Sequence, residues 1–208
     1  MDPTTLTFSD PGGDFYLVLY VPQNARTDSS GDTEMLDRAA LPHRKLWFWV
    51  DSKKMRRALP NFQAVIDEGD SNPYQRPREI ELLYLRFFRP YAVRIVLNII
   101  HGRDDLVPKR LDHHMRLDVA RVVYHFQCSE VVAAFSRKWC EGIIENRSAL
   151  LRENARRALE LLFMAMAFQH DFNFFFMSTV IVCHSRGVPL DSDIPLPRDL
   201  LRKRTRST

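Results

Sequence analysis

Hydrophobic residues in the first part of the chain form short runs that chain-breaking residues separate. Residues 15–21 lie between a Gly-Gly pair and Pro22, and residues 45–51 form a second run rich in aromatic side chains. Bounded runs of this length predict β-strands, and residues 79–85 are a third candidate. The residues between the first two runs, 22–43, are polar and predict a loop insertion that is long for a compact domain.

The rest of the chain has the periodicity of α-helices. Residues 91–100 follow Pro90 and end before Gly102, which are the residues expected at the start and end of a helix. Further helices are predicted at residues 111–126, from residue 129 with Ser129 as its N-cap, at 148–169 and at 172–185. Because strands precede helices and do not alternate with them, the sequence predicts an α+β fold.

Two of the helical segments carry a more specific expectation. Ser52 is placed to cap a short helix at residues 53–59, and Pro60 to end that helix and begin another at 61–66. The longest apolar stretch, residues 172–183, is shorter than the roughly 20 residues of a membrane span. It therefore predicts a buried helix.

The balance of charge is mildly basic. Thirty Lys and Arg residues stand against 26 Asp and Glu residues, which gives a formal charge of +4. The densest basic cluster is the tail at residues 201–208, for which a solvated terminus is favoured over a binding site. Together with an arginine-rich helix (Arg147, Arg152, Arg156 and Arg157), the tail supports an alternative function in which the protein is nuclear or associated with nucleic acid.

The cysteines and the first residues of the chain indicate the cellular compartment in which the protein is expected. Cys128, Cys140 and Cys183 are an odd set without a CxxC pair, so neither a disulfide framework nor a zinc knuckle is predicted. A reducing compartment is expected, the cytoplasm, the nucleus or both. The first ten residues lack the basic and apolar regions of a secretory leader, and no membrane association is expected.

Motifs of catalysis and cofactor binding do not occur in the sequence. It contains no GxGxxG, Walker loop, GxSxG or HExxH. His113-His114 and Cys183-His184 are adjacent pairs, and adjacent residues of a helix point about 100° apart, so neither pair converges on one metal ion. No enzyme activity, metal or cofactor is predicted.

Two other features have both a structural and a functional interpretation. His101 follows an apolar helix, and a capping role is favoured over catalysis, with the helix C-terminus favouring the imidazolium form. Trp47, Phe48 and Trp49 could stack on nucleic-acid bases. A role in the core is favoured for them, because aromatic residues dominate core burial.

Short motifs in the first 140 residues follow one another in an order that is more informative than any one of them alone. They are Gly13-Asp14 before the first strand, Ser52-x-x-Met55 with Leu59-Pro60-x-Phe62 after the second, His101-Gly102 at the end of an apolar helix, and then Val107-Pro108, Leu111, Val119-Ala120, Tyr124, Cys128 and Trp139. This series resembles a BTB/POZ domain of the diverged kind abundant in fungi, followed by a helical extension. The resemblance implies a small sheet packed on a cluster of helices.

The resemblance also divides the chain. It implies a disordered N-terminus at residues 1–12, a BTB/POZ-like domain at 13–128 that contains the 22–43 insertion, a helical extension at 129–200 and the basic tail at 201–208. Members of the family act by binding proteins, through self-association or by recruiting cullin-type ligase scaffolds or corepressors. The implied function is therefore a protein-interaction module, a scaffold or adaptor that assembles with protein partners or with itself as a homodimer.

The resemblance implies five residues for the contact surface. They are Asp14, Phe62, Val65, Ile66 and Glu68. Asp14 stands where dimeric members keep a buried charge, so it is expected to have a basic partner or to be in contact with water. The segment at residues 67–73 departs from the one that cullin-binding members use, which argues against cullin binding by this chain.

Overall fold

The computed structural model describes residues 6–22, 43–60, 62, 78–82, 88–141 and 155–184. Strands come first and helices follow, which confirms the predicted α+β class. The chain divides into two compact units, Met1–Arg103 and Asp104–Thr208. The boundary expected after residue 128 differs from this division, because it falls inside the second unit, between two helices that contact each other.

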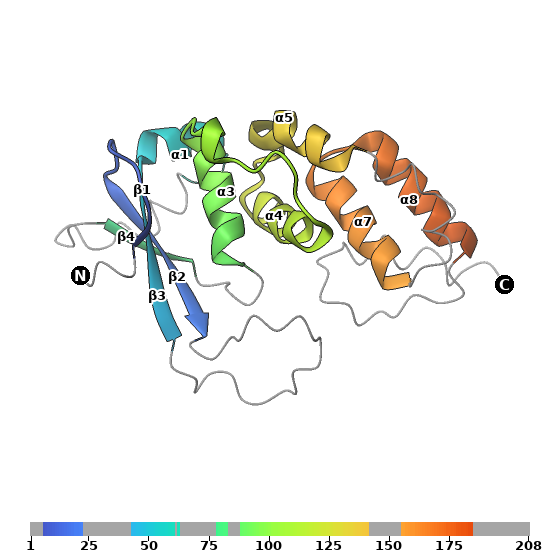
Figure 1. Cartoon of the computed structure of the whole chain (residues 1–208), viewed down its shortest axis with the longest axis horizontal. Helices are drawn as coiled ribbons and strands as arrows, with labels where there is room; N and C mark the ends of the chain where they lie inside the picture. Colours follow the sequence, from blue (N-terminus) through green and yellow to red (C-terminus); the bar gives the residue numbers. More distant parts are fainter. Residues whose placement is uncertain are drawn as a thin grey trace. The chain divides into compact units, whose positions relative to one another are not determined.

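The first unit is built on a four-stranded mixed sheet (Figure 1). Its strands are β1 (Leu6–Ser9), β2 (Phe15–Pro22), β3 (His43–Val50) and β4 (Arg78–Leu82), in the spatial order β1-β3-β2-β4. β2 and β3 are antiparallel, whereas β1 runs parallel to β3 and β4 parallel to β2. All three predicted strands are present, and residues 83–85 of the third lie outside the described residues.

β1 lies within the segment expected to be disordered, so that prediction is wrong for Leu6–Ser9. Phe8 pairs with Phe48 in the register and is buried. Its ring centroid is 5.1 Å from that of His101. Burying an aromatic side chain between the sheet and a helix offsets the entropy of ordering this short segment.

Alternate residues of a strand point to opposite faces of a sheet. On the face that includes Phe8, the side chains of Leu17, Leu19 and Phe48 are fully buried. Helix α3 (Pro90–Ile100) contacts β1, and most of its side chains are buried, as expected for a helix that is apolar nearly all round.

The short helix α1 (Ser52–Ala58) begins one residue earlier than predicted. Its N-cap is Asp51, whose carboxylate accepts hydrogen bonds from the backbone N–H groups of Lys53 at 2.8 Å and Lys54 at 3.3 Å. The predicted cap, Ser52, is wrong, because this serine is already in the first turn of the helix and its hydroxyl donates to Asp14.

The second unit is helical. Its elements are η3 (Asp104–Leu106), α4 (His113–Phe126), α5 (Ser129–Cys140), α7 (Ala155–Ala167) and α8 (Asp171–His184). α7 contacts both α4 and α8, and α5 contacts α4 (Figure 1). The N-cap of α5 is Cys128, and the predicted cap, Ser129, is wrong because it is the first helical residue. In the part of the chain that is described, no helix has the length and apolar character needed to cross a membrane.

Candidate functional site

Three segments that carry the family resemblance meet at the start of α1. The carboxylate of Asp14 accepts hydrogen bonds from the backbone N–H and the hydroxyl of Ser52, both at 2.7 Å. The backbone N–H of Asp51 donates to Nε2 of His101 at 3.1 Å. These bonds connect residues 38 and 50 positions apart in the chain. We call Asp14, Asp51, Ser52 and His101 the α1 junction.

His101 is held as the neutral imidazole at the end of α3. Because Nε2 accepts from Asp51, the ring hydrogen is on Nδ1, which donates to the carbonyl of Leu97 at 2.8 Å. Burial of the ring lowers the pKa of His101 below its ordinary value. The predicted capping role is confirmed, since His101 is the C-cap residue of α3. The predicted imidazolium is wrong, because desolvation outweighs the attraction of the helix C-terminus.

Next to the junction, Asp10 is a carboxylate that is only 3% exposed. Its two oxygens lie 3.1 Å from Nζ of Lys54 and 3.1 Å from Nη2 of Arg103. Burial alone would raise the pKa of Asp10, but the hydrogen bond from Lys54 and the neighbouring positive charges lower it below 3.8. The buried carboxylate with basic partners is therefore Asp10. Asp14 was expected either to have a basic partner or to be in contact with water, and it is exposed to water.

The face of the sheet opposite Phe48 is aromatic. Tyr16, Trp47 and Trp49 are half-buried there, and the ring centroid of Tyr16 lies 4.4 Å from that of Trp49 and 5.4 Å from that of Trp47. We call these three residues the aromatic face. The predicted core role holds for Phe48, which is fully buried, but not for its two neighbours, because adjacent residues of a strand point to opposite faces.

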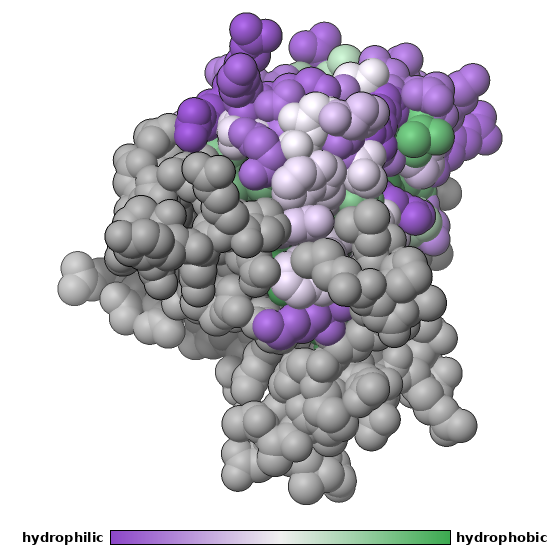
Figure 2. Space-filling view, turned by 90° about the vertical axis from the view of Figure 1, so that its left-hand side faces the viewer, coloured by the Kyte–Doolittle hydropathy of each residue, from purple (hydrophilic) through white to green (hydrophobic). Residues whose placement is uncertain are grey.

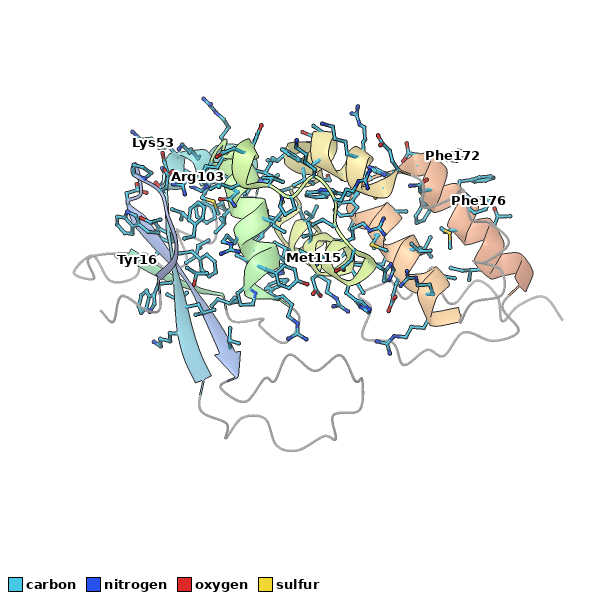
Figure 3. All side chains as sticks on the ribbon, in the orientation of Figure 1. Tyr16, Lys53, Arg103, Met115, Phe172 and Phe176 are labelled. Atoms are coloured by element: carbon cyan, nitrogen blue, oxygen red, sulfur yellow. The ribbon has the colours of Figure 1, made fainter. Side chains whose placement is uncertain are left out.

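The aromatic face is open to solvent in part. Figure 2 views the molecule from the sheet side, where residues of intermediate hydropathy form a pale column. Tyr16, labelled in Figure 3, lies at the sheet on the side away from α3. At one end of the face, Nζ of Lys45 is 6.0 Å from the ring centroid of Trp47, within the range of a cation–π contact.

Gly13 supports this face, because a Cβ atom at this position would overlap the indole ring of Trp49. We therefore expect Gly13→Ala to lower the free energy of unfolding by about 1–3 kcal/mol, the usual cost of overpacking. Urea denaturation followed by circular dichroism measures this change. Gly12→Ala is the matched control, since a Cβ there would meet its nearest atom, Oδ2 of Asp51, at 3.4 Å, an ordinary contact. Equal stability of both variants and the wild type would contradict this role of Gly13.

In the second unit, a buried hydrogen bond connects α4 and α7. Nε2 of His113 donates to the carboxylate of Glu160 at 2.7 Å, and Nε of Arg156 donates to the other oxygen at 3.3 Å. Nδ1 of His113 is buried without a partner among the described residues. The hydrogen bond from His113, then the charges of His113 and Arg156, lower the pKa of Glu160 despite its burial.

The five residues expected at the contact surface are not gathered into one described site. Asp14 belongs to the α1 junction. Phe62 is buried, with its ring centroid 5.9 Å from that of Phe15, so its side chain packs in the core and is not available at a surface. Val65, Ile66 and Glu68 lie outside the described residues. The aromatic face was missed because a run of aromatic letters does not tell which residues point inward.

Groups that could hold a metal ion are absent from the described part of the chain. His113 is buried, whereas its neighbour His114 is exposed. Burial raises the pKa of the Cys128 thiol to about 12 and that of the Cys140 thiol to about 11, so neither is a reactive thiolate at neutral pH. The basic tail at 201–208 lies outside the described residues.

Comparisons with known proteins identify no relative of this chain. No protein family, no curated protein and no solved structure matches it.

Proposed function

We propose that the protein is an interaction module of the BTB/POZ type that acts as a scaffold or adaptor. The α1 junction is the observation that carries the proposal. The residues of the resemblance that are far apart in the sequence, Asp14, Ser52 and His101, are hydrogen-bonded parts of one structural unit around Asp51. A series of motifs that meets in space is a more specific sign of a family than the same motifs scattered over a fold.

The aromatic face supports a binding role and is the contact surface that we propose. Tyrosine and tryptophan are enriched among the residues that dominate binding energy at protein interfaces. Their rings lose little conformational entropy on binding, and each still has a polar group that can donate a hydrogen bond. Tyr16, Trp47 and Trp49 are already in ring contact, so a partner would meet a surface that is largely formed before binding.

Affinity capture of the tagged full-length chain from its native cells, with mass spectrometry, tests the proposal. The wild type is compared with a Trp47→Thr, Trp49→Thr variant, in which threonine keeps the preference for a strand. We expect specific partners to be at least about tenfold depleted with the variant, as for the loss of more than 1.4 kcal/mol of binding energy. Leu106→Ala, on η3 in the second unit, is the control and should retain them, because Leu106 is exposed and lies outside the aromatic face.

The outcomes separate the parts of the proposal. Recovery of a cullin and its partners would make the protein a ligase adaptor, and recovery of other proteins would make it a scaffold of a different assembly. Equal recovery with the wild type and the tryptophan variant would remove the aromatic face as the contact surface. Absence of any protein enriched over an untagged control would count against the interaction module itself.

A further inference from the structure

The polar atoms of the aromatic face have no partner in the described part of the chain. Tyr16, Trp47 and Trp49 make no side-chain hydrogen bond there. The buried polar atoms without a partner in that part belong to His113 and Arg121, so the aromatic face presents its polar atoms to solvent. An indole N–H only donates, and a tyrosine hydroxyl both donates and accepts. The face therefore offers hydrogen-bond donors together with flat apolar rings.

Hydrogen-bond acceptors are scarce on the aromatic face. Tyr16 is on β2 and the two tryptophans are on β3, and these two inner strands of the sheet use their backbone carbonyls in strand pairing. Among the three side chains, only the hydroxyl oxygen of Tyr16 can accept. A partner that brought backbone N–H groups to this face would leave most of them unpaired, which is unfavourable once water is excluded. A fitting partner has carbonyls to offer and few N–H groups.

We propose that the aromatic face binds a proline-rich segment of a partner protein in the polyproline II conformation. This inference rests on the proposed function, because it names the chemistry of the partner that the aromatic face takes. Proline has no backbone N–H. The polyproline II helix has no internal hydrogen bonds, so its carbonyls are available to the two indole N–H groups and the hydroxyl of Tyr16. Its pyrrolidine rings are apolar and pack on aromatic rings.

The spacing of the rings suits such a segment. Trp47 and Trp49 are two residues apart on β3, a separation of roughly 6.8 Å at about 3.4 Å per residue. Two residues of a polyproline II helix advance about 6.2 Å, so a segment that runs along β3 meets both tryptophans in step. Tyr16 contacts both rings from β2. Since the rings and the polyproline II helix are both formed before binding, little conformational entropy is lost.

The charge at the aromatic face disfavours other ligands of aromatic surfaces. Nζ of Lys45 is 6.0 Å from the ring centroid of Trp47, so a cation already lies near this ring and would repel a second one, such as a methylated lysine. A single-stranded nucleic acid stacks on aromatic rings but also needs a series of cations along its backbone. In the part of the chain that is described, Lys45 is the cation near these rings. A proline-rich segment is neutral and needs no such series.

NMR titration of the ¹⁵N-labelled full-length chain with decaproline tests the proposal. The chain has three tryptophans, and each gives its own indole N–H signal. The signals of Trp47 and Trp49, assigned with Trp47→Phe and Trp49→Phe variants, should shift saturably with a Kd below about 1 mM. The signal of Trp139 is the internal control and should not move, because its N–H donates to the carbonyl of Pro108. An alternating alanine–serine peptide of the same length should shift none of the three.

Removal of one hydroxyl tests the hydrogen-bonding argument. Tyr16→Phe should weaken decaproline binding about 2- to 10-fold, the effect of one net hydrogen bond. Tyr124→Phe is the matched control and should bind as the wild type does, since Tyr124 is 40% exposed on α4 in the second unit. Equal affinity of Tyr16→Phe and the wild type would overturn the argument from donors and acceptors.

Three outcomes of the titration would overturn the proposal. They are unmoved Trp47 and Trp49 signals, equal shifts with the alanine–serine peptide, and shifts with single-stranded oligothymidylate but not with decaproline. The last of these would favour the association with nucleic acid. If decaproline failed while the capture experiment still recovered partners that depend on the two tryptophans, the partner class would be wrong and the interaction module would stand, so the two failures are distinguishable.

Discussion

Replacing Trp139 with alanine is expected to lower the free energy of unfolding by about 3–5 kcal/mol, the cost of removing a large buried aromatic side chain. Trp139 is buried, and its ring centroid lies 5.9 Å from that of Phe135 and 6.4 Å from that of Phe168. Its indole N–H donates to the carbonyl of Pro108 at 2.9 Å. The substitution would leave a cavity and an unpaired carbonyl at the same place.

Trp139 also has a backbone role that alanine would preserve. Its carbonyl accepts a hydrogen bond from Nη1 of Arg116 at 2.7 Å. The stability lost in Trp139→Ala therefore reports the contribution of the Trp139 side chain alone. Trp139→Phe keeps most of the ring and loses the bond to Pro108, so we expect a smaller cost of about 1–3 kcal/mol.

Urea denaturation followed at 222 nm measures both losses, with Leu106→Ala as an exposed control that changes stability by less than about 0.5 kcal/mol. If Trp139→Ala were as stable as that control, Trp139 would not be part of the core of the second unit. Equal losses in the Ala and Phe variants would assign the whole effect to the hydrogen bond.

The spacing between Pro108 and Trp139 was visible in the sequence, but the bond between them was not. Periodicity predicts that Trp139 faces inward on a helix. It does not tell which carbonyl the indole N–H will meet, because that depends on how the preceding loop returns to the helix. The α1 junction is similar: the sequence marks Asp14 and His101 as notable residues, but their hydrogen-bond partners, Ser52 and Asp51, follow from tertiary packing.

Neighbouring residues with similar chemistry account for a second kind of difference between the expected and the observed structure. Asp51 and Ser52 are both good N-caps, and the sequence favours neither, because each can accept a hydrogen bond from a backbone N–H. The buried carboxylate at Asp10 was missed, since its partners Lys54 and Arg103 are distant in the chain. The exposed Phe172 and Phe175 are a different case: the pattern of α8 predicts a helix buried on all sides, and that prediction is wrong for the face that carries them.

The second large effect is expected at Glu160 in the helical unit. Glu160→Leu should lower the free energy of unfolding by about 3 kcal/mol, because removing one member of a buried polar pair leaves the other unpaired. Nδ1 of His113 already has no partner among the described residues, so loss of the carboxylate would leave both ring nitrogens unpaired. The loss of the bond from Arg156, whose side chain is largely exposed, should add little to this cost.

The contribution of Glu160 should depend on pH in one direction. Its pKa in the folded protein is below the ordinary value of 4.5, so around pH 4 the folded state binds fewer protons than the unfolded state. The stabilisation is therefore complete above about pH 5 and is lost as the pH falls through the lowered pKa. Urea titrations from pH 7 to pH 3 should show the wild type and Glu160→Gln converging at the acidic end. A difference that grows toward low pH would refute this assignment.

Combining substitutions at His113 and Glu160 distinguishes the energy of their hydrogen-bonded pair from the energy of burying each side chain. A buried polar pair replaced by apolar residues of similar size is often neutral or stabilising, whereas loss of one partner is costly. We therefore expect His113→Leu, Glu160→Leu together to recover most of the stability that Glu160→Leu loses, so that the two substitutions are strongly non-additive. If the double variant instead loses the sum of the two single effects, His113 and Glu160 act separately, and the contact between α4 and α7 is held by their apolar side chains alone.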